Sequence, residues 1–311
     1  MASRIHVPTQ SHGDRLLWPE RADSGNYDGF TLVELLVALV ITAGLSMIVF
    51  QLFHQNERVF RDQNLVIEMQ QSARAVAAQI SDEIRMAGQG VPVYASSFDD
   101  VKAEATAPIL SSSNSSRIDF RSGLSNAETN VTTPPPIDFG LNVSRTITVA
   151  DAKPFSSGDS VYIWGPTADS TWTWVRAEVT GISSNTMTLT PRQSGAAVIR
   201  FASPPALSLE EAVSIYLSGT VIKRATAANM TNAASPTWSA ANEIGRNFAA
   251  LEFTYFDNNG NLVLPASLAN RISIARVDVR LVAQTASALS NGVRPAYSVS
   301  VRTIPRNMKV R

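Results

Sequence analysis

The chain has 311 residues, enough for one large domain or two small ones, and its 44% hydrophobic content is ordinary for a protein that buries a core. Its formal net charge is zero, so the total charge favours neither nucleic acid nor an anionic membrane surface as a partner. The absence of cysteine excludes thiolate nucleophiles, cysteine-ligated metals and disulfides.

Residues 1–29 form a polar segment with charges of both signs and scattered proline and glycine. Such a composition cannot bury enough apolar surface to fold, so we predict that this segment is disordered. Its arginines favour a cytoplasmic location only weakly, because Arg58 and Arg61 on the far side of the following apolar run nearly cancel the bias. Charge counting alone therefore does not fix the orientation.

An uncharged apolar run from Leu35 to Phe53 is the strongest hydrophobic feature of the chain. As a helix its 19 residues would rise about 28 Å, close to the hydrocarbon thickness of a bilayer. The run is longer than the apolar part of a secretory signal, and no small-x-small cleavage site lies nearby. We therefore predict a membrane-spanning helix over about residues 32–53, rather than a buried core helix or a cleaved signal.

A carboxylate stands at the entrance to this predicted helix, in the sequence GFTLVE from Gly29 to Glu34. An ionised side chain at the centre of a bilayer costs about 2.5–3.5 kcal/mol, and less near the interface, so Glu34 needs a polar partner. Cleavage after Gly29 would create a charged α-amine on Phe30, one helical turn from Glu34. The same carboxylate could equally meet the amine of a neighbouring chain.

The longer sequence GFTLVELLVALVI resembles the class III signal of type IV prepilins and type II secretion pseudopilins. The resemblance implies that a prepilin peptidase cleaves the Gly29–Phe30 bond, removes residues 1–29 as a leader peptide and methylates the new amino group of Phe30. It also implies that Glu34 is needed for assembly. The expected partners are the peptidase, other major and minor pilins, and an inner-membrane assembly platform.

The predicted helix continues beyond the membrane, because neither glycine nor proline occurs between Leu45 and Ala87, and we assign the N-terminal pilin helix to residues 30–90. The stretch EMQQSARAVAAQISDEIRMAG also resembles the helix of PilW-type minor pilins and J-type pseudopilins. Apolar residues at spacings of three and four predict a face that packs on a domain of the same chain. These residues are Val66, Met69, Ala73, Val76, Ala77, Ile80 and Ile84.

Residues 91–311 are rich in Ser, Thr, Asn and Pro with short apolar runs, which predicts a β-rich head. Residues 95–116 and 122–136 are predicted loops, Leu207–Ala212 has some helical period, and a split into two subdomains near residue 205 is left open. The predicted fold class is α+β, a long N-terminal helix packed on an antiparallel β-rich head. The predicted strands are Arg117–Arg121, Arg145–Ala150, Ser160–Trp164, Trp172–Thr180, Thr186–Thr190, Ala197–Phe201, Ala212–Leu217, Thr220–Ala225, Ala250–Phe256, Ile272–Val282 and Ala296–Thr303.

Candidate chemical sites in the predicted head are few. The segment Asp257–Asn261 has oxygen ligands at the spacing that begins a calcium loop, but it lacks the downstream glutamate of an EF-hand and fits a hairpin turn better. All histidines lie outside the head, which therefore has no Ser-His-Asp arrangement and no histidine metal site. We expect no enzyme activity, metal, cofactor or small-molecule substrate. The histidines are His6, His12 and His54.

Four tryptophans of the head could stack on a carbohydrate or a nucleobase. Three of them lie in or beside predicted strands, which favours packing between strands instead. They are Trp164, Trp172, Trp174 and Trp238.

The segment from Arg271 to Arg311 holds eight basic residues and one acid, a net charge of +7. It fits a solvated strand face with a free terminus, a contact with the acidic surface of the next pilin, or DNA capture. No interleaved aromatic residues accompany the arginines, so we do not expect nucleic acid as a partner. The possible basic contact surface comprises Arg276, Arg280, Arg302 and Arg306.

The major pilins of the family often have a proline near the middle of the membrane helix and a C-terminal cysteine pair, and this sequence has neither. We therefore predict a structural minor pilin that helps to initiate assembly at or near the filament tip. The alternatives are a J-type pseudopilin at the tip of a type II secretion pseudopilus, or a pilus-borne adhesin or DNA-uptake subunit. We expect a single-pass inner-membrane protein with a cytoplasmic leader and a periplasmic head, which reaches the cell surface in the pilus.

Overall fold

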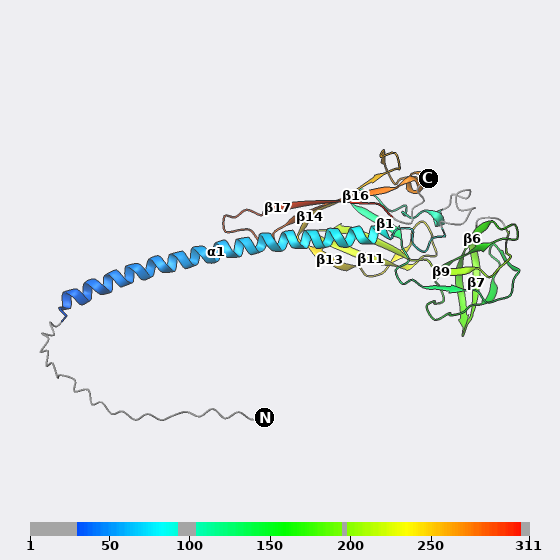
Figure 1. Cartoon of the computed structure of the whole chain (residues 1–311), viewed down its shortest axis with the longest axis horizontal. Coiled ribbons are helices and arrows are strands. Elements are labelled where there is room, and N and C mark those ends of the chain that lie inside the picture. Colours follow the sequence, from blue (N-terminus) through cyan, green and yellow to red (C-terminus); the bar gives the residue numbers. More distant parts are fainter. Residues whose placement is uncertain (1–29, 93–103, 195–197, 306–311) are drawn as a thin grey trace, which may run out of the picture. The chain divides into compact units, whose positions relative to one another are not determined.

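The computed structural model describes residues 30–92, 104–194 and 198–305, and the chain divides into two compact units, residues 1–56 and 57–311 (Figure 1). Helix α1 runs from Leu32 to Arg85. This confirms the predicted long helix, which ends five residues before the predicted bound at residue 90.

Two glycines in the left-handed region follow α1 and turn the chain away from the helix axis. Gly88 has a φ of 85° and Gly90 a φ of 81°, a backbone conformation that glycine adopts without the steric cost of a Cβ. The Gly88 N–H donates to the carbonyl of Arg121 at 2.8 Å. The glycines therefore end the helix and join it to the head.

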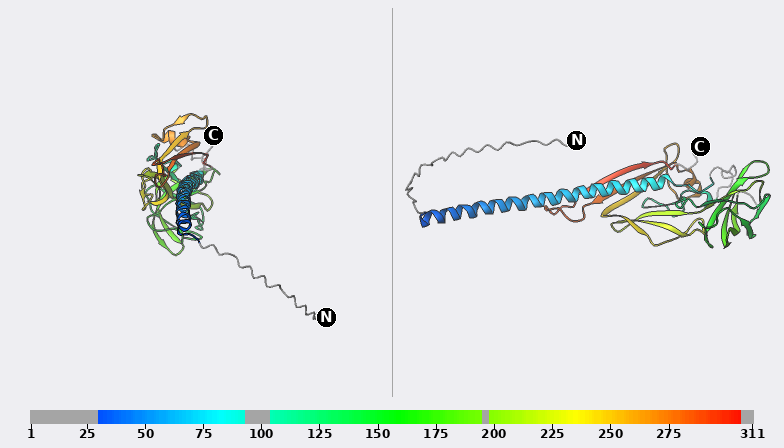
Figure 2. Two further views of the ribbon diagram at one scale, coloured as in Figure 1. Left: turned by 90° about the vertical axis from the view of Figure 1, so that its left-hand side faces the viewer. Right: turned by 60° about the horizontal axis from the view of Figure 1, so that its bottom comes forward.

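The second half of α1 supplies one wall of the main hydrophobic core of the head. Its buried residues are those of the predicted stripe from Met69 to Ile84, with Ser81 added and Val66 only partly buried. They pack against aromatic and aliphatic side chains of two sheets that lie along this half of the helix (Figure 2). The apolar face predicted from the sequence is thus the face of α1 that contacts the sheets.

Both sheets of this helix-packed lobe are antiparallel. One has the order β1-β10-β11-β12, with β13 also paired to β11, and the other has the order β15-β14-β16-β17. The strands are β1 (Arg117–Arg121), β10 (Ala212–Ser218), β11 (Val221–Asn229), β12 (Thr237–Trp238), β13 (Asn242–Arg246), β14 (Phe248–Phe256), β15 (Leu262–Val263), β16 (Arg276–Gln284) and β17 (Ala296–Thr303).

A second lobe is inserted between two paired strands of the first. Arg121 at the end of β1 lies opposite Ala212 at the start of β10, so residues 122–211 leave and re-enter the helix-packed lobe at one point. This inserted lobe has a six-stranded sheet of order β2-β9-β5-β6-β7-β4, a β3-β8 pair and its own core. The strands are β2 (Glu128–Asn130), β3 (Ile137–Gly140), β4 (Arg145–Thr148), β5 (Ser160–Pro166), β6 (Trp172–Ser183), β7 (Thr186–Ser194), β8 (Val198–Phe201) and β9 (Ala206–Leu209).

The predicted α+β class is confirmed, but several local predictions were wrong. The sequence left open a split near residue 205, and the head contains two lobes, the second an insertion bounded near residues 122 and 211. Leu207–Ala212 is not helical, because it spans the end of β9 and the start of β10. Residues 95–116 and 122–136 are not simply loops, since they contain the 3₁₀ turn η2 (Glu104–Thr106) and strand β2.

The predicted strand Ile272–Val282 begins too early. A short helix α2, Leu268–Ser273, occupies its first two residues, and β16 starts only at Arg276. The hydroxyl of Ser267 accepts a hydrogen bond from the N–H of Asn270 and caps this helix. Residues at an N-cap offer the backbone a helical start that competes with the strand pattern.

Candidate functional site

Thr31 and Glu34 form a reciprocal cap at the N-terminal end of α1. The carboxylate Oε2 of Glu34 accepts hydrogen bonds from the backbone N–H and the hydroxyl of Thr31, each at 3.0 Å. In return, the Thr31 hydroxyl oxygen accepts from the Glu34 N–H at 3.3 Å. This is the capping-box arrangement, whose signature is Ser or Thr followed by Glu or Gln three residues later.

The half of α1 that follows this cap exposes its apolar side chains. Its most apolar 18-residue window has a mean hydropathy of 2.5 and is 0% buried in the isolated chain. Phe30, Leu39 and Phe50 are all at least 65% exposed. By length and composition this helix is able to cross a membrane. A continuous apolar surface of this kind requires a bilayer or other apolar helices around it.

The predicted scissile bond lies at the edge of the described residues. Gly29 is outside them, whereas Phe30 is exposed and directly precedes the Thr31 cap. Cleavage of this bond and methylation of Phe30 are therefore predictions from the motif. The structure adds that Phe30 lies two residues before α1 begins and that Glu34 lies in the first turn of this helix.

A family model described as the prokaryotic N-terminal methylation motif matches residues 25–50. The chain carries a prepilin-type methylation motif. The match includes Gly29, Phe30 and Glu34 and extends into the exposed apolar half of α1, so these findings are consistent with a type IV pilin-like protein. No curated protein matches the chain.

The prepilin-type motif implies processing by a prepilin peptidase and association with other pilins and a membrane platform. The apolar helix near the N-terminus also fits anchoring in the inner membrane. Processing at the Gly29–Phe30 bond stays a prediction from the motif, and the exposed apolar half of α1 fits a subunit held by its N-terminal helix.

The predicted basic residues within the described range share one face of the sheet β15-β14-β16-β17, and each has an acidic neighbour. Arg276 Nε lies 3.2 Å from Asp278 Oδ1, and Arg302 Nε lies 3.7 Å from the same oxygen. Arg280 Nη1 donates to Glu252 Oε2 at 3.0 Å. These three arginines share two carboxylates, so this face has a net charge of only +1. Arg306 lies outside the described residues.

The segment Asp257–Asn261 forms the predicted turn, between β14 and β15. Asp257 Oδ1 accepts hydrogen bonds from the N–H groups of Asn259 and Asn261 at 2.9 and 2.8 Å, and Oδ2 accepts from the Asn261 side chain at 3.0 Å. These bonds hold the pKa of Asp257 below its ordinary value. The carboxylate is thus engaged by its own turn, and the described residues contain no cluster of three potential metal ligands.

The tryptophans do not form one surface. Trp174 is fully buried, and Trp238 belongs to β12 in the other lobe. Trp164 and Trp172 stack on each other with ring centroids 5.7 Å apart, at one end of the β5–β6 hairpin. This geometry is packing between neighbouring strands, with Trp172 still 41% exposed.

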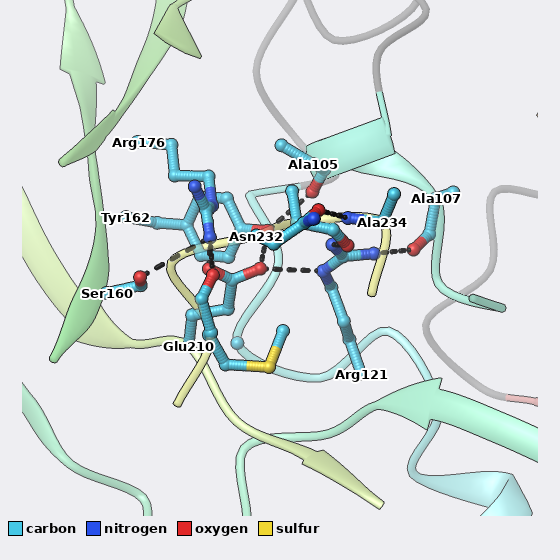
Figure 3. Close-up of polar contacts among 12 residues, drawn as sticks. Ala105, Ala107, Arg121, Ser160, Tyr162, Arg176, Glu210, Asn232 and Ala234 are labelled. Atoms are coloured by element: carbon cyan, nitrogen blue, oxygen red, sulfur yellow. Dashed lines mark hydrogen bonds and ion pairs between the residues drawn. The ribbon is translucent and has the colours of Figure 1, made fainter. Parts of the chain in front are cut away.

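One buried polar cluster among the described residues was not predicted from the sequence. Glu210, between β9 and β10, is fully buried and pairs with two buried arginines (Figure 3). Its Oε1 accepts from Arg121 Nε at 2.8 Å, and its Oε2 accepts from Arg176 Nε at 2.7 Å. Tyr162 also donates to Glu210 Oε1 at 3.0 Å, and burial raises the pKa of this phenol, which keeps it protonated as a donor.

This Glu210 cluster joins the two lobes. Arg121 lies in β1 of the helix-packed lobe, whereas Tyr162 and Arg176 lie in β5 and β6 of the inserted lobe. Arg121 also donates to the backbone carbonyls of Ala107 at 2.5 Å and Ala233 at 2.6 Å, and Arg176 donates to the hydroxyl of Ser160 at 3.3 Å. Each charged side chain of the cluster is thus bonded within the protein, so the cluster is a structural joint.

Proposed function

We propose that this chain is a structural minor pilin of PilW type, which helps to initiate a type IV pilus at or near the filament tip. The observation that carries the proposal is one continuous helix with two different halves. One half bears the methylation motif and an apolar surface without a covering partner in the described chain, and the other half is built into the core of a large head. Such a subunit can polymerise through the first half and display the second.

Two features of the sequence support a minor rather than a major subunit. α1 contains no proline from Leu32 to Arg85, and the chain contains no cysteine. Major pilins of the resembled family often carry a proline in the membrane helix and a C-terminal disulfide. The resemblance of residues 68–88 to J-type pseudopilins supports a second candidate, a subunit at the tip of a type II secretion pseudopilus.

A non-enzymatic role agrees with how the polar groups of the head are used. The buried carboxylate of Glu210 is held by two guanidinium groups and a phenol, and Asp257 is held by its own turn. Both carboxylates are therefore engaged by groups of the protein, and neither is placed as a general acid or base toward a substrate. We propose that the head acts through its surfaces, in the periplasm before assembly and on the pilus afterwards.

The test is deletion of the gene combined with quantification of the protein in sheared filaments. A minor pilin should be present at far lower stoichiometry than the major subunit, and its deletion should reduce the number of surface filaments while the major pilin accumulates in the membrane. Normal surface filaments combined with loss of exoprotein secretion would support the pseudopilin instead. Normal filaments and normal secretion would contradict both candidates.

A further inference from the structure

Strand β17 is the longest strand at a sheet edge in the described part of the chain. It has eight residues, whereas the other strands at sheet edges have two to five. β17 pairs with β16 along its whole length without a bulge, and it contains neither proline nor lysine. Short length, bulges, proline and charged side chains, lysine above all, are the usual devices that stop an edge from pairing with another chain. β17 carries one charge, Arg302 near its end, so the rest of its length is an unprotected edge.

The hydrogen-bond pattern shows which backbone groups of β17 face this open edge. The Phe253 N–H donates to the carbonyl of Ser115 at 2.8 Å, away from β16. Because the direction of hydrogen bonding alternates along antiparallel strands, Val279 opposite Phe253 bonds toward β17, and Val301 opposite Val279 bonds toward β16. No backbone partner is present among the described residues for the alternate amides of β17. These amides belong to Ser298, Ser300 and Arg302.

The side chains of β17 alternate in the same way. Tyr297, Val299 and Val301 are only partly buried where they pack against the main core. The opposite face ends in the exposed Arg302, which shares its acid, Asp278, with a second arginine. An additional strand would cover the half-exposed apolar side chains and could place a carboxylate opposite Arg302.

We propose that β17 pairs with an extended, antiparallel strand of a different pilin-type subunit. That strand presents apolar side chains to the inner face and an acidic side chain opposite Arg302. The identity of the partner as a filament subunit rests on the proposed function, whereas the pairing itself rests on the open edge. Main-chain hydrogen bonds would supply affinity, and the alternating side chains would supply specificity.

The direction of β17 argues against a second copy of this chain as the partner. Arg74 of α1 bonds to Tyr297 at 3.3 Å, and Ser81, further along α1, bonds to Thr303, further along β17, at 2.9 Å. The strand and this part of the helix therefore run in the same direction. Copies packed with this part of α1 side by side in one direction would therefore hold their β17 strands parallel. Parallel pairing through the same edge needs a two-fold axis along the strands, which would set the apolar face of one sheet beside the polar face of the other.

The test uses the full chain in detergent and the synthetic peptide Glu-Val-Thr-Val-Thr-Val-Thr, which places Glu opposite Arg302 in antiparallel pairing. The control peptide has Lys in place of Glu. Fluorescence anisotropy should show about tenfold tighter binding of the Glu peptide at low salt, because the charge opposite Arg302 changes sign between the two. Amide exchange should slow in residues 296–303 and not elsewhere.

Matched variants at Ser300 separate edge pairing from other modes of binding. Ser300→Pro removes an N–H that points to the open edge and leaves the ladder with β16, whereas Ser300→Ala keeps that N–H. The proline variant should lose about tenfold in affinity for the Glu peptide and the alanine variant should lose none. Thermal unfolding of both variants checks that the fold is retained, and Arg302→Glu, which should reverse the peptide preference, provides an independent measure.

Equal binding by the two Ser300 variants, protection outside β17, or self-association of the chain through β17 would overturn the proposal. The peptide assay does not depend on filament assembly. A negative result would therefore remove the strand pairing and leave the minor-pilin proposal to its own test.

Discussion

Replacing Glu210 by alanine should destabilise the head by about 4 kcal/mol, because the change leaves two buried guanidinium groups without a counter-charge. Breaking a buried ion pair by removing one partner costs about 3–5 kcal/mol. Glu210 neutralises both Arg121 and Arg176, whose side chains are 1% and 2% exposed, so the loss should not fall at the low end of that range. For a domain of this size the change corresponds to a fall in melting temperature of about 8–16 °C.

The assay is urea unfolding of the fragment Glu57–Arg311, which corresponds to one compact unit of the chain. Trp174 is buried in the same small core as Tyr162, so tryptophan fluorescence reports on the region of the cluster. The matched control is Glu252→Ala, which removes the acid of an ion pair that is about half exposed on both sides and should cost less than about 1 kcal/mol.

Equal unfolding midpoints for the Glu210 and Glu252 variants would refute this reasoning. A triple replacement of Glu210 by Leu and of both arginines by Met provides a second check. Because it removes the buried charges together, it should recover most of the stability that the single change loses. If it were as unstable as Glu210→Ala, the loss would come from packing and not from the unpaired charges.

Three further predictions concern the processed end, the helix contact and a loop. Mass spectrometry of the mature protein should find an N-methylated N-terminal Phe30, and an intact Met1 in a peptidase-positive host would contradict this. Gly245→Ala should cost about 1–3 kcal/mol, because a Cβ there would lie 2.7–2.8 Å from two side chains of the core, whereas Gly181→Ala, with no neighbour within 3.7 Å, should be nearly neutral. Hydrogen bonds from Ser290 hold the pKa of Asp62 below its ordinary value, so this contact should persist above about pH 4 and be lost only as the pH falls further, as followed by the Ser290 amide resonance.

The long helix and two strands could be predicted because their patterns are local. β1 and β17 match their predicted bounds at both ends, since each alternating run stops at turn-forming residues. The inserted lobe could not be predicted, because the pairing of Arg121 with Ala212 joins residues far apart in the sequence. Leu207–Ala212 looked helical because two short strands that follow each other can imitate helical spacing.

The residues of the candidate site also differ in whether they could be predicted from local sequence. Gly29, Phe30 and Glu34 stand together in one short motif, so their role could be predicted without any tertiary contact. The Glu210 cluster could not, since its members come from three strands and the β9–β10 connection, and each one looks like an ordinary surface charge or strand residue in its own neighbourhood. Only the fold shows that they are buried together.

Glu34 has two roles at the N-terminal end of α1 that substitutions can separate: it accepts hydrogen bonds in the cap, and it carries a negative charge that can pair with an α-amine. The predicted cleavage lies before Phe30, so Thr31 would keep its N–H and hydroxyl, and the cap is compatible with a chain that begins at Phe30. Thr31 occupies only Oε2, and a carboxylate has about four acceptor positions, so Oε1 can still accept from an α-amine.

Glu34→Gln keeps an acceptor for the cap but removes the charge, whereas Glu34→Leu removes both. An unpaired carboxylate among packed helices would cost several kcal/mol, and pairing with the amine of an adjacent subunit offsets that cost and fixes the axial register of the two helices. If the charge directs assembly, both variants should be cleaved and inserted normally yet appear in sheared filaments at no more than about a tenth of the wild-type amount. Normal incorporation of Glu34→Gln alone would assign the role to the cap. Normal incorporation of both would show that this carboxylate is dispensable, as expected only for a subunit at the extreme tip with no neighbour above it.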